Sequence, residues 1–200
     1  YDQHPEAIQP ESRRNEVFRF IESGLKDLSI SRRTLKWGVP VPGDDNHVMY
    51  VWLDALTNYL TVLGYPNHEF DNYWNQAIHV VGKDILRFHS VYWPAFLMAA
   101  DITPPKIVFA HGWWMVEGEK MSKSLGNAID PVEIVKIYGS DALRYFMLRD
   151  LSFGQDGDFS KDSFLTRLNT DLANAYGNLC QRVLSFIYKN TDATIPTPGN

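Results

Sequence analysis

Three apolar stretches without polar alternation constrain the fold of this chain more than any other feature. They are VMYVW at 48–52, AIHVV at 77–81 and KIVFAHGWWMV at 106–116. β-Branched and aromatic residues of this kind favour strands, and strands that are apolar throughout are typical of parallel sheets covered on both faces. Helical patterns follow at 53–60 and 85–100, so we predict an α/β fold built on a parallel sheet.

The segments around these strands predict further elements. The first 12 residues are polar and contain two prolines, which indicates an irregular lead-in. Residues 12–24 carry apolar side chains at helical spacing, with Gly24 as a stop signal. Residues 29–43 predict a short strand followed by an extended Pro/Gly segment, and Pro94 should kink the helix in which it lies.

The C-terminal third is expected to be helical. Asp130 can cap a helix that starts at Pro131 and ends at Gly139, and Ser140 can cap the next one. FGQDGDF then indicates a turn, and Ser160 can cap a long helix. The apolar stripe of that helix suits a helix bundle. It consists of Phe164, Leu168, Leu172, Ala175, Leu179, Val183 and Phe186.

Composition excludes several classes of protein. With 44% hydrophobic and 22% charged residues, the 200-residue chain is globular, and its net charge of −5 argues against binding nucleic acid by charge alone. One cysteine cannot form an internal disulfide or a cysteine-based zinc site. No apolar run reaches the ~20 residues of a membrane helix. The first residues resemble no signal peptide and lack an initiator Met, so we expect a piece of a longer protein.

KMSKS at 120–124 places two lysines and two serines directly after an apolar strand. Both lysines can reach one anion, and the serines with the amides near Gly126 can donate hydrogen bonds to phosphate oxygens. Such a cluster is useful where negative charge builds in a transition state, and ligands bind at the carboxyl ends of parallel strands. For the KxxK spacing alone, a solvated lysine-rich turn is the more common explanation.

In full, HGWWMVEGEKMSKSLGN at 111–127 resembles the signature loop of class I aminoacyl-tRNA synthetases, and within them the methionyl-tRNA synthetase family. Further stretches of that family occur in the same order, and the resemblance covers nearly all of residues 12–183. They are GLKDLSISRRTLKWGVPVPG, HVMYVWLDALTNYL, HVVGKDILRFHSVYWPAFL, YGSDALRYFMLRDLSFGQDGDFS and RLNTDLANAYGNL. The resemblance implies a Rossmann-type catalytic domain followed by the start of an anticodon-binding helical bundle. It also implies activation of methionine with ATP and Mg²⁺, and transfer of the methionyl group to tRNA(Met).

The resemblance assigns the nucleotide site. It implies that Lys123, and less centrally Lys120, stabilise the triphosphate as pyrophosphate leaves. Gly82 and Asp84 would hold the ATP ribose, although GKD taken alone is an ordinary turn. The complete set implied to bind ATP is Gly82, Asp84, the backbone near Trp114, Lys120, Ser122, Lys123 and Ser124. Sheet core is the simpler explanation for the side chains of Trp113 and Trp114.

The resemblance also assigns a methionine pocket. Trp52 and Tyr59 would wrap the substrate side chain, and His89 would lie near its sulfur. From spacing alone, the stripe on residues 52–59 would be a core face, and a lone histidine beside Phe88 a packed core residue. The residues implied to bind methionine are Trp52, Ala55, Leu56, Tyr59, Ile85, Phe88, His89 and Arg32, the last near the substrate carboxylate. Many family members carry proline at Leu56 and some a tryptophan at Leu28, whereas His79 and His111 indicate packing rather than a metal site.

Part of the family pattern lies outside this chain. No HxGH sequence occurs, so we expect a partner segment, the missing N-terminal half of the same enzyme. The expected boundaries are 1–15 for the end of a connecting insertion, 16–128 for the second catalytic half, 129–163 for a stem-contact segment and 164–200 for the start of the anticodon-binding domain. We expect no membrane partner and a cytoplasmic or organellar location. The alternatives are another class I synthetase or a non-catalytic RNA-binding module.

Overall fold

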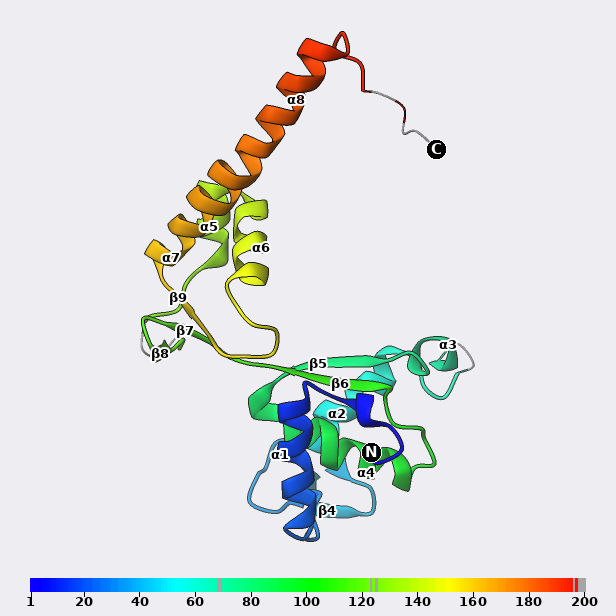
Figure 1. The fold of residues 1–200 in the computed structure, drawn as a ribbon. Coiled ribbons are helices and arrows are strands. Elements are labelled where there is room, and N and C mark those ends of the chain that lie inside the picture. Colours follow the sequence, from blue (N-terminus) through cyan, green and yellow to red (C-terminus); the bar gives the residue numbers. More distant parts are fainter. Residues whose placement is uncertain (68–69, 123, 125, 196, 198–200) are drawn as a thin grey trace. The chain divides into compact units, whose positions relative to one another are not determined.

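The computed structural model describes residues 1–67, 70–122, 124, 126–195 and 197. The chain forms two compact units, Tyr1–Gly112 and Trp113–Asn200 (Figure 1). Within the described residues, no helix is both long enough and apolar enough to pass through a membrane.

The first unit contains a parallel sheet. Its order is β1 (Ile8–Gln9), β6 (Ile107–His111) and β5 (Ile78–Gly82), and both neighbouring pairs run parallel. The predicted parallel sheet is therefore confirmed. The prediction of an irregular lead-in is wrong at β1, where Ile8 pairs with Val108 and is only 1% exposed. Two residues are too few to show a strand pattern in the sequence.

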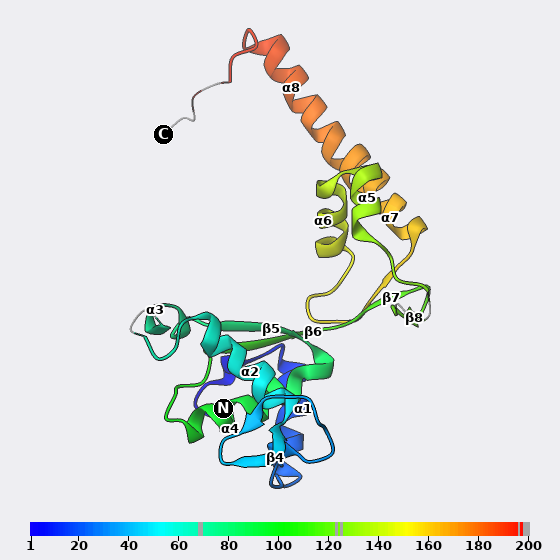
Figure 2. The same ribbon diagram turned by 180° about the vertical axis from the view of Figure 1, so that it is seen from behind.

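Helices cover one face of this sheet. They are α1 (Glu11–Glu22), α2 (Val51–Val62) and α4 (Trp93–Ala99), and Figures 1 and 2 show them on the same side of β5 and β6. His79 and Val81 of β5 point into the buried side, whereas Ile78 and Val80 are 54% and 66% exposed. Burial of the sheet on both faces was thus a wrong expectation for the described chain.

The prediction that 48–52 forms a strand of the parallel sheet is also wrong. A separate antiparallel sheet has the order β2 (Ser31–Arg32), β4 (Asp44–Met49) and β3 (Pro40–Val41). β4 ends at Met49, Tyr50 occupies the N-cap position of α2 without a side-chain hydrogen bond, and Val51 is 64% exposed as the first helical residue. Helix α2 buries Leu56 and Leu60 on one face. Its first two residues belong to the apolar run at 48–52, whose residue types had indicated a strand.

The segment after β5 contains the expected irregularity at Pro94. A 3₁₀ turn, η2 (Lys83–Ile85), leads into a π-helical stretch, η3 (Phe88–Tyr92), and then into α4. Pro94 lacks a backbone N–H and cannot form the bond to the preceding turn, which accounts for the widened helix before it. A short helix, α3 (Phe70–Trp74), precedes β5, and a 3₁₀ turn, η1 (Pro5–Ala7), precedes β1.

The second unit starts with a small sheet of order β8 (Glu119–Lys120), β7 (Trp114–Val116) and β9 (Gly157–Phe159). β7 pairs with β9 in parallel, so the single predicted strand at 106–116 is divided between two sheets. The turn predicted at 153–159 missed β9. Gly157 allows this strand because a methyl group there would lie 1.7 Å from Leu151 Cδ2.

Helices complete the second unit. They are α5 (Pro131–Tyr138), α6 (Ser140–Arg149), α7 (Lys161–Arg167), the π-helical η4 (Leu168–Gly177) and α8 (Asn178–Asn190). The caps at Asp130 and Ser160 are confirmed, since their side chains accept from Val132 N and Ser163 N. The cap at Ser140 is wrong, because Gly139 with φ +85° occupies that position. Phe146 and Phe164 form the core, whereas the stripe is 58%, 47% and 66% exposed at Leu179, Val183 and Phe186.

Candidate active site

The structure brings four of the predicted methionine residues together in one aromatic cluster of the first unit. Trp52 of α2 stacks on Phe88 of η3, with ring centroids 3.9 Å apart and planes 9° from parallel. His89 presents its ring edge to Trp52 at 6.1 Å. Trp52, Phe88 and Tyr59 are half-buried, whereas His89 is buried. Flat rings with accessible faces are suited to an apolar or thioether side chain.

A chain of hydrogen bonds fixes the protons of this cluster. His89 Nδ1 lies 3.0 Å from the carbonyl oxygen of Ile85, so this nitrogen carries the proton and donates it. His89 Nε2 is then an acceptor, and the Tyr59 hydroxyl donates to it at 2.9 Å. Burial lowers the pKa of His89 against the opposing effect of the Ile85 carbonyl, and burial raises the pKa of Tyr59. Both groups are therefore neutral at physiological pH.

A second histidine, His79, packs against the ring of Tyr59. The ring of His79 in β5 stacks on the Tyr59 ring at 4.3 Å and 29°. Trp93 Nε1 donates to His79 Nε2 at 3.1 Å, in the buried interior. Burial, and secondarily the nearby His89, lowers the pKa of His79 to about 4. This agrees with the packing role expected for His79.

The other predicted methionine residues lie in different surroundings. Leu56 is 1% exposed and belongs to the core between α2 and α4, and Ala55 is exposed one position earlier. Ile85 offers its carbonyl to His89, but its side chain packs against the core beside α1. The Arg32 guanidinium lies 4.0 Å from the Tyr50 ring centroid and donates to the Ser29 and Ser31 carbonyls.

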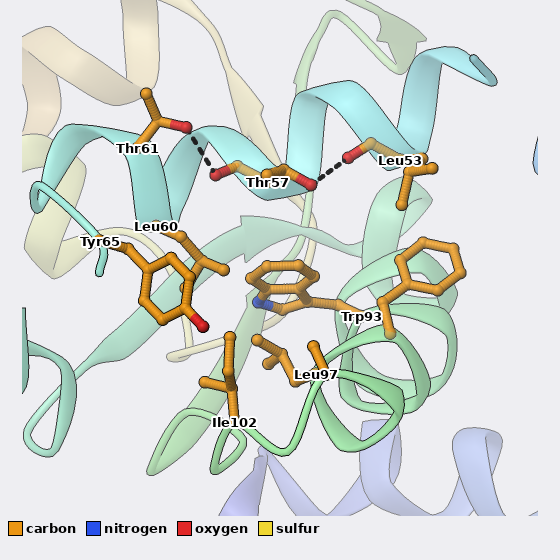
Figure 3. Close-up of a pocket in the computed structure, with 10 residues that line it drawn as sticks. Leu53, Thr57, Leu60, Thr61, Tyr65, Trp93, Leu97 and Ile102 are labelled. Atoms are coloured by element: carbon orange, nitrogen blue, oxygen red, sulfur yellow. Dashed lines mark hydrogen bonds between the residues drawn. The ribbon is translucent and has the colours of Figure 1, made fainter. Parts of the chain in front are cut away.

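Trp93 also lines a separate cavity of about 310 Å³ between α2 and α4 (Figure 3). Thr57 and Thr61 line it from α2, and their hydroxyls donate to the Leu53 and Thr57 carbonyls one turn earlier. Because those hydroxyls are already bonded to the helix, the cavity surface is largely apolar. None of the predicted methionine residues lines this cavity.

Gly82 and Asp84 form a close local pair at the carboxyl end of β5. Gly82 ends the strand opposite His111 of β6, and Asp84 follows in the 3₁₀ turn, exposed. A methyl group at Gly82 would lie 2.6 Å from Asp84 Oδ1, closer than side chains tolerate. Gly82 therefore permits the position of the Asp84 carboxylate, at the edge where parallel sheets bind ligands.

The second unit holds the described part of the KMSKS loop through Asn127. Its Oδ1 accepts from Ser122 N at 2.8 Å, and its Nδ2 donates to the Lys120 carbonyl at 3.2 Å. The Ser122 and Ser124 hydroxyls are hydrogen-bonded to each other at 2.7 Å. Lys123 lies outside the described residues.

Lys120 of the loop and Trp114 of the preceding strand each contact an aromatic ring. Lys120 Nζ lies 3.9 Å from the centroid of the Trp113 ring, a cation–π arrangement. Trp114 packs against Phe146 with centroids 5.8 Å apart, which fits the expected core role of its side chain. Trp114 and Met121 line an apolar cavity of about 250 Å³. In the described ranges, no three His, Cys, Asp or Glu side chains are grouped to hold a metal ion.

Sequence reasoning missed several residues that support these sites. Asn127 was noted only as part of the motif, although it bonds to Lys120 and Ser122 at the start of the loop. Asp158 of β9 accepts from Gly118 N at 2.9 Å and secures the β7–β8 turn. The pairing of Trp93 with His79 joins residues 14 positions apart. An Asn after glycine is a turn signal, but no comparable signal marks the buried pair.

The chain belongs to the family described as tRNA synthetases class I (M), whose pattern matches residues 1–184. It is similar to a "Methionine--tRNA ligase" of Mesorhizobium japonicum, at 59% identity over 201 residues, and to one of Rickettsia bellii, at 56% over 198 residues. These alignments cover 100% and 98% of this chain, and 39% of each relative.

Solved structures agree with this assignment. The fold is similar to a Mycobacterium tuberculosis methionyl-tRNA synthetase in complex with methionyl-adenylate, with a TM-score of 0.89 and 55% identity. The apo form from the same organism gives a TM-score of 0.85 and 51% identity. Each covers all of this chain and 40% or 39% of the other. The chain thus has the α/β fold of this family and spans about two fifths of its relatives' length.

Proposed function

We propose that this chain is the second catalytic half of an enzyme that activates methionine with ATP and transfers it to tRNA(Met). In activation, a methionine carboxylate oxygen attacks the α-phosphorus of ATP. A new oxygen–phosphorus bond forms, the bond to the bridging oxygen breaks, and pyrophosphate leaves. A tRNA hydroxyl then takes the methionyl group and releases AMP.

The aromatic cluster carries this proposal. Trp52 and Phe88 contribute stacked rings, and Tyr59 and His89 contribute a hydrogen-bonded polar pair whose protons are assigned. Contact between a thioether sulfur and an aromatic ring contributes about 0.3–1.5 kcal/mol. The neutral state of His89 supports this role, because a neutral ring avoids placing a charge beside an apolar substrate side chain. Ala55, Leu56, Ile85 and Arg32 are proposed as further pocket residues, following the family pattern.

For ATP, the proposal assigns the ribose to Gly82 and Asp84. An aspartate can accept hydrogen bonds from both ribose hydroxyls, and the absent side chain at Gly82 leaves room for its carboxylate. The adenine would lie against the backbone near Trp114. Mg²⁺ would arrive with the ATP phosphates, since the described residues offer no cluster of metal ligands.

The phosphates are proposed to bind the loop at 120–124. Lys120 and Lys123 would neutralise charge on the departing pyrophosphate, and Ser122 and Ser124 would donate hydrogen bonds. The Trp113 ring lies 3.9 Å from the Lys120 ammonium, a contact that would keep this charge at the start of the loop.

The remaining proposals concern the rest of the enzyme. The exposed side chains of Ile78 and Val80 support an additional segment against the sheet, as expected for a missing N-terminal half. We propose that the domains are divided after residues 15, 128 and 163. Residues 164–200 would then begin the anticodon-binding domain that contacts tRNA. A cytoplasmic or organellar location is proposed on the same family basis.

The test is methionine-dependent exchange of pyrophosphate into ATP. The 200-residue chain is assayed alone and joined to the N-terminal segment of the Mesorhizobium japonicum relative. We expect exchange only from the joined protein, because catalysis by positioning requires both sides of the triphosphate to be held. Robust exchange from the chain alone would contradict the proposed division. Exchange stimulated by leucine or valine but not methionine would contradict the substrate.

A further inference from the structure

We infer that Met121, the second residue of KMSKS, is a positioning residue for the ATP step, because its side chain anchors the start of the loop in an apolar cavity of the second unit. The inference rests on the proposed function, in which the lysines before and after Met121 stabilise the departing pyrophosphate. It assigns a task to a side chain that has no group to bind phosphate. The cavity is the one of about 250 Å³ that Trp114 and Met121 line.

The pleat of the small sheet determines the direction of the Met121 side chain. β7 and β8 are antiparallel, with Met115 opposite Lys120, and this register carried one residue further places Met121 opposite Trp114. Successive side chains of an extended segment point to opposite faces, so Lys120 and Met121 leave the chain in opposite directions. Lys120 lies over the ring of Trp113. Met121 instead lines the cavity together with Trp114.

The walls of this cavity belong to the packed part of the second unit. Four of the lining residues also pack against the core that contains Phe146 and Phe164, and they come from β7, α5, α6 and β9. They are Trp114, Ile134, Leu143 and Phe159. Because an apolar side chain placed against such walls removes apolar surface from water, the cavity favours the thioether chain of Met121.

An anchor at Met121 limits where the charges of the loop can lie. The residues on either side of it are tied to Asn127, through the Lys120 carbonyl and the Ser122 amide. Those bonds join the two ends of the loop, whereas the contact of Met121 joins the loop to the helices. Lysine side chains have many rotamers, so the position of the backbone decides where their ammonium groups can reach. A misplacement of about 1 Å can slow a reaction about 100-fold.

The type of side chain at 121 fits this task. Methionine is unbranched and flexible, so it fills an irregular cavity and keeps contact with its walls when the backbone shifts. A loop that binds the departing pyrophosphate must rearrange during each reaction cycle. A methionine anchor keeps the start of the loop attached during such a rearrangement.

A matched pair of variants tests the inference in the joined protein. Met121→Ala and Met147→Ala remove the same atoms from two sides of one cavity, but Met147 belongs to α6 and not to the loop. We expect Met121→Ala to slow adenylate formation about 10- to 100-fold in single-turnover kinetics, with the methionine Kd within about twofold. Met147→Ala should leave the rate of adenylate formation within about twofold. Thermal unfolding of both variants is the control for folding.

Two further variants distinguish an apolar anchor from general damage. Met121→Leu keeps an apolar side chain of similar size, so we expect adenylate formation within about threefold of the wild-type rate. Met121→Gln keeps the length but places an amide against apolar walls, so we expect it to be as slow as Met121→Ala. In NMR spectra of the joined protein with labelled methionine methyl groups, the signal that Met121→Leu removes should be displaced by the ring of Trp114.

The outcomes separate two failures. Three results would each overturn the positioning role while wild-type exchange upholds the proposed function. They are a wild-type rate in Met121→Gln, equal slowing by Met121→Ala and Met147→Ala, and a Met121 methyl signal without displacement by an aromatic ring. A joined wild-type protein without methionine-dependent exchange would overturn both.

Discussion

Gly82→Ala is the substitution whose effect the structure defines most narrowly. The backbone at Gly82 has φ −68° and ψ 147°, which alanine adopts without strain. The added methyl group would instead lie 2.6 Å from Asp84 Oδ1, where ordinary contacts begin near 3.4 Å. The Asp84 carboxylate must then move by about 0.8 Å, the difference between these two distances.

The expected consequence is a loss of ATP affinity. A displacement of this size would break or lengthen at least one of the proposed hydrogen bonds from ribose to the carboxylate, worth about 1.5–3 kcal/mol. This corresponds to an ATP KM raised roughly 10- to 150-fold. The assay is pyrophosphate exchange by the full-length enzyme at varied ATP and then varied methionine, together with thermal unfolding of the variant.

Asp84→Asn provides the matched comparison, because it changes the same group without adding volume at Gly82. Both variants should weaken ATP and leave the methionine KM nearly unchanged. An ATP KM unaltered by Gly82→Ala would refute the reasoning, since the carboxylate would then not be the ribose ligand. A comparable rise in both substrates' KM would indicate instead that the turn as a whole had been disturbed.

Three further outcomes are expected. Trp52→Ala should raise the methionine Kd about 10- to 100-fold by removing one of two stacked rings, whereas Trp37→Ala, at a residue 92% exposed, should leave it unchanged in calorimetry. Asn127→Ala should slow adenylate formation in stopped-flow kinetics about tenfold or more, because two loop hydrogen bonds are lost, with methionine affinity unaffected. His79 binds a proton below about pH 6.5 in the unfolded chain but only near pH 4 in the folded chain. Its contribution to the free energy of unfolding is therefore fully present above pH 6.5, and that free energy should fall by about 2 kcal/mol when the pH is lowered to 5. Denaturant titration of the chain and of His79→Gln checks this, and equal pH dependence of the two would contradict it.

The elements that local sequence predicts well are those fixed by local chemistry. Asp130 and Ser160 cap helices through bonds to residues two and three positions away, and Pro94 interrupts its own helix. The apolar strands at β5 and β6 depend on side-chain type, and they pair in parallel as expected. In each case the pattern and its physical cause lie within a few residues.

The elements that were missed depend on distant partners. β1 exists because Ile8 pairs with Val108, 100 positions away, and β9 because Trp114 pairs with Gly157. Residues 48–52 have high strand propensity, but tertiary packing outweighs it, because Trp52, Leu56 and Leu60 can pack against η3 and α4 only from a helix. Propensity could not decide among these without the tertiary contacts.

The site shows the same division. Spacing alone left Trp52, Tyr59 and His89 as core residues, and their proposed roles came from resemblance to a family. The structure adds that their rings meet in one cluster and that His79 and Trp93 support them. Those supports could not be predicted, because a buried histidine has the same appearance in the sequence whether it fills space or orients a neighbour.

The two parts of the candidate site are stabilised in different ways, and the difference suits their proposed tasks. Tyr59 is held on two sides by buried histidines, so turning it would disturb the bond between His79 and Trp93 as well. The described part of the KMSKS loop is held by weaker contacts, among them the two hydrogen bonds of the half-buried Asn127, one part-buried and one exposed, and the exposed bond between the Ser122 and Ser124 hydroxyls. Exposed hydrogen bonds are readily exchanged for water. A pocket that selects one amino acid requires side chains that keep their positions, whereas a phosphate-binding loop must rearrange as pyrophosphate leaves. Buried contacts on one part and contacts near solvent on the other therefore favour a fixed methionine pocket and an adaptable ATP loop.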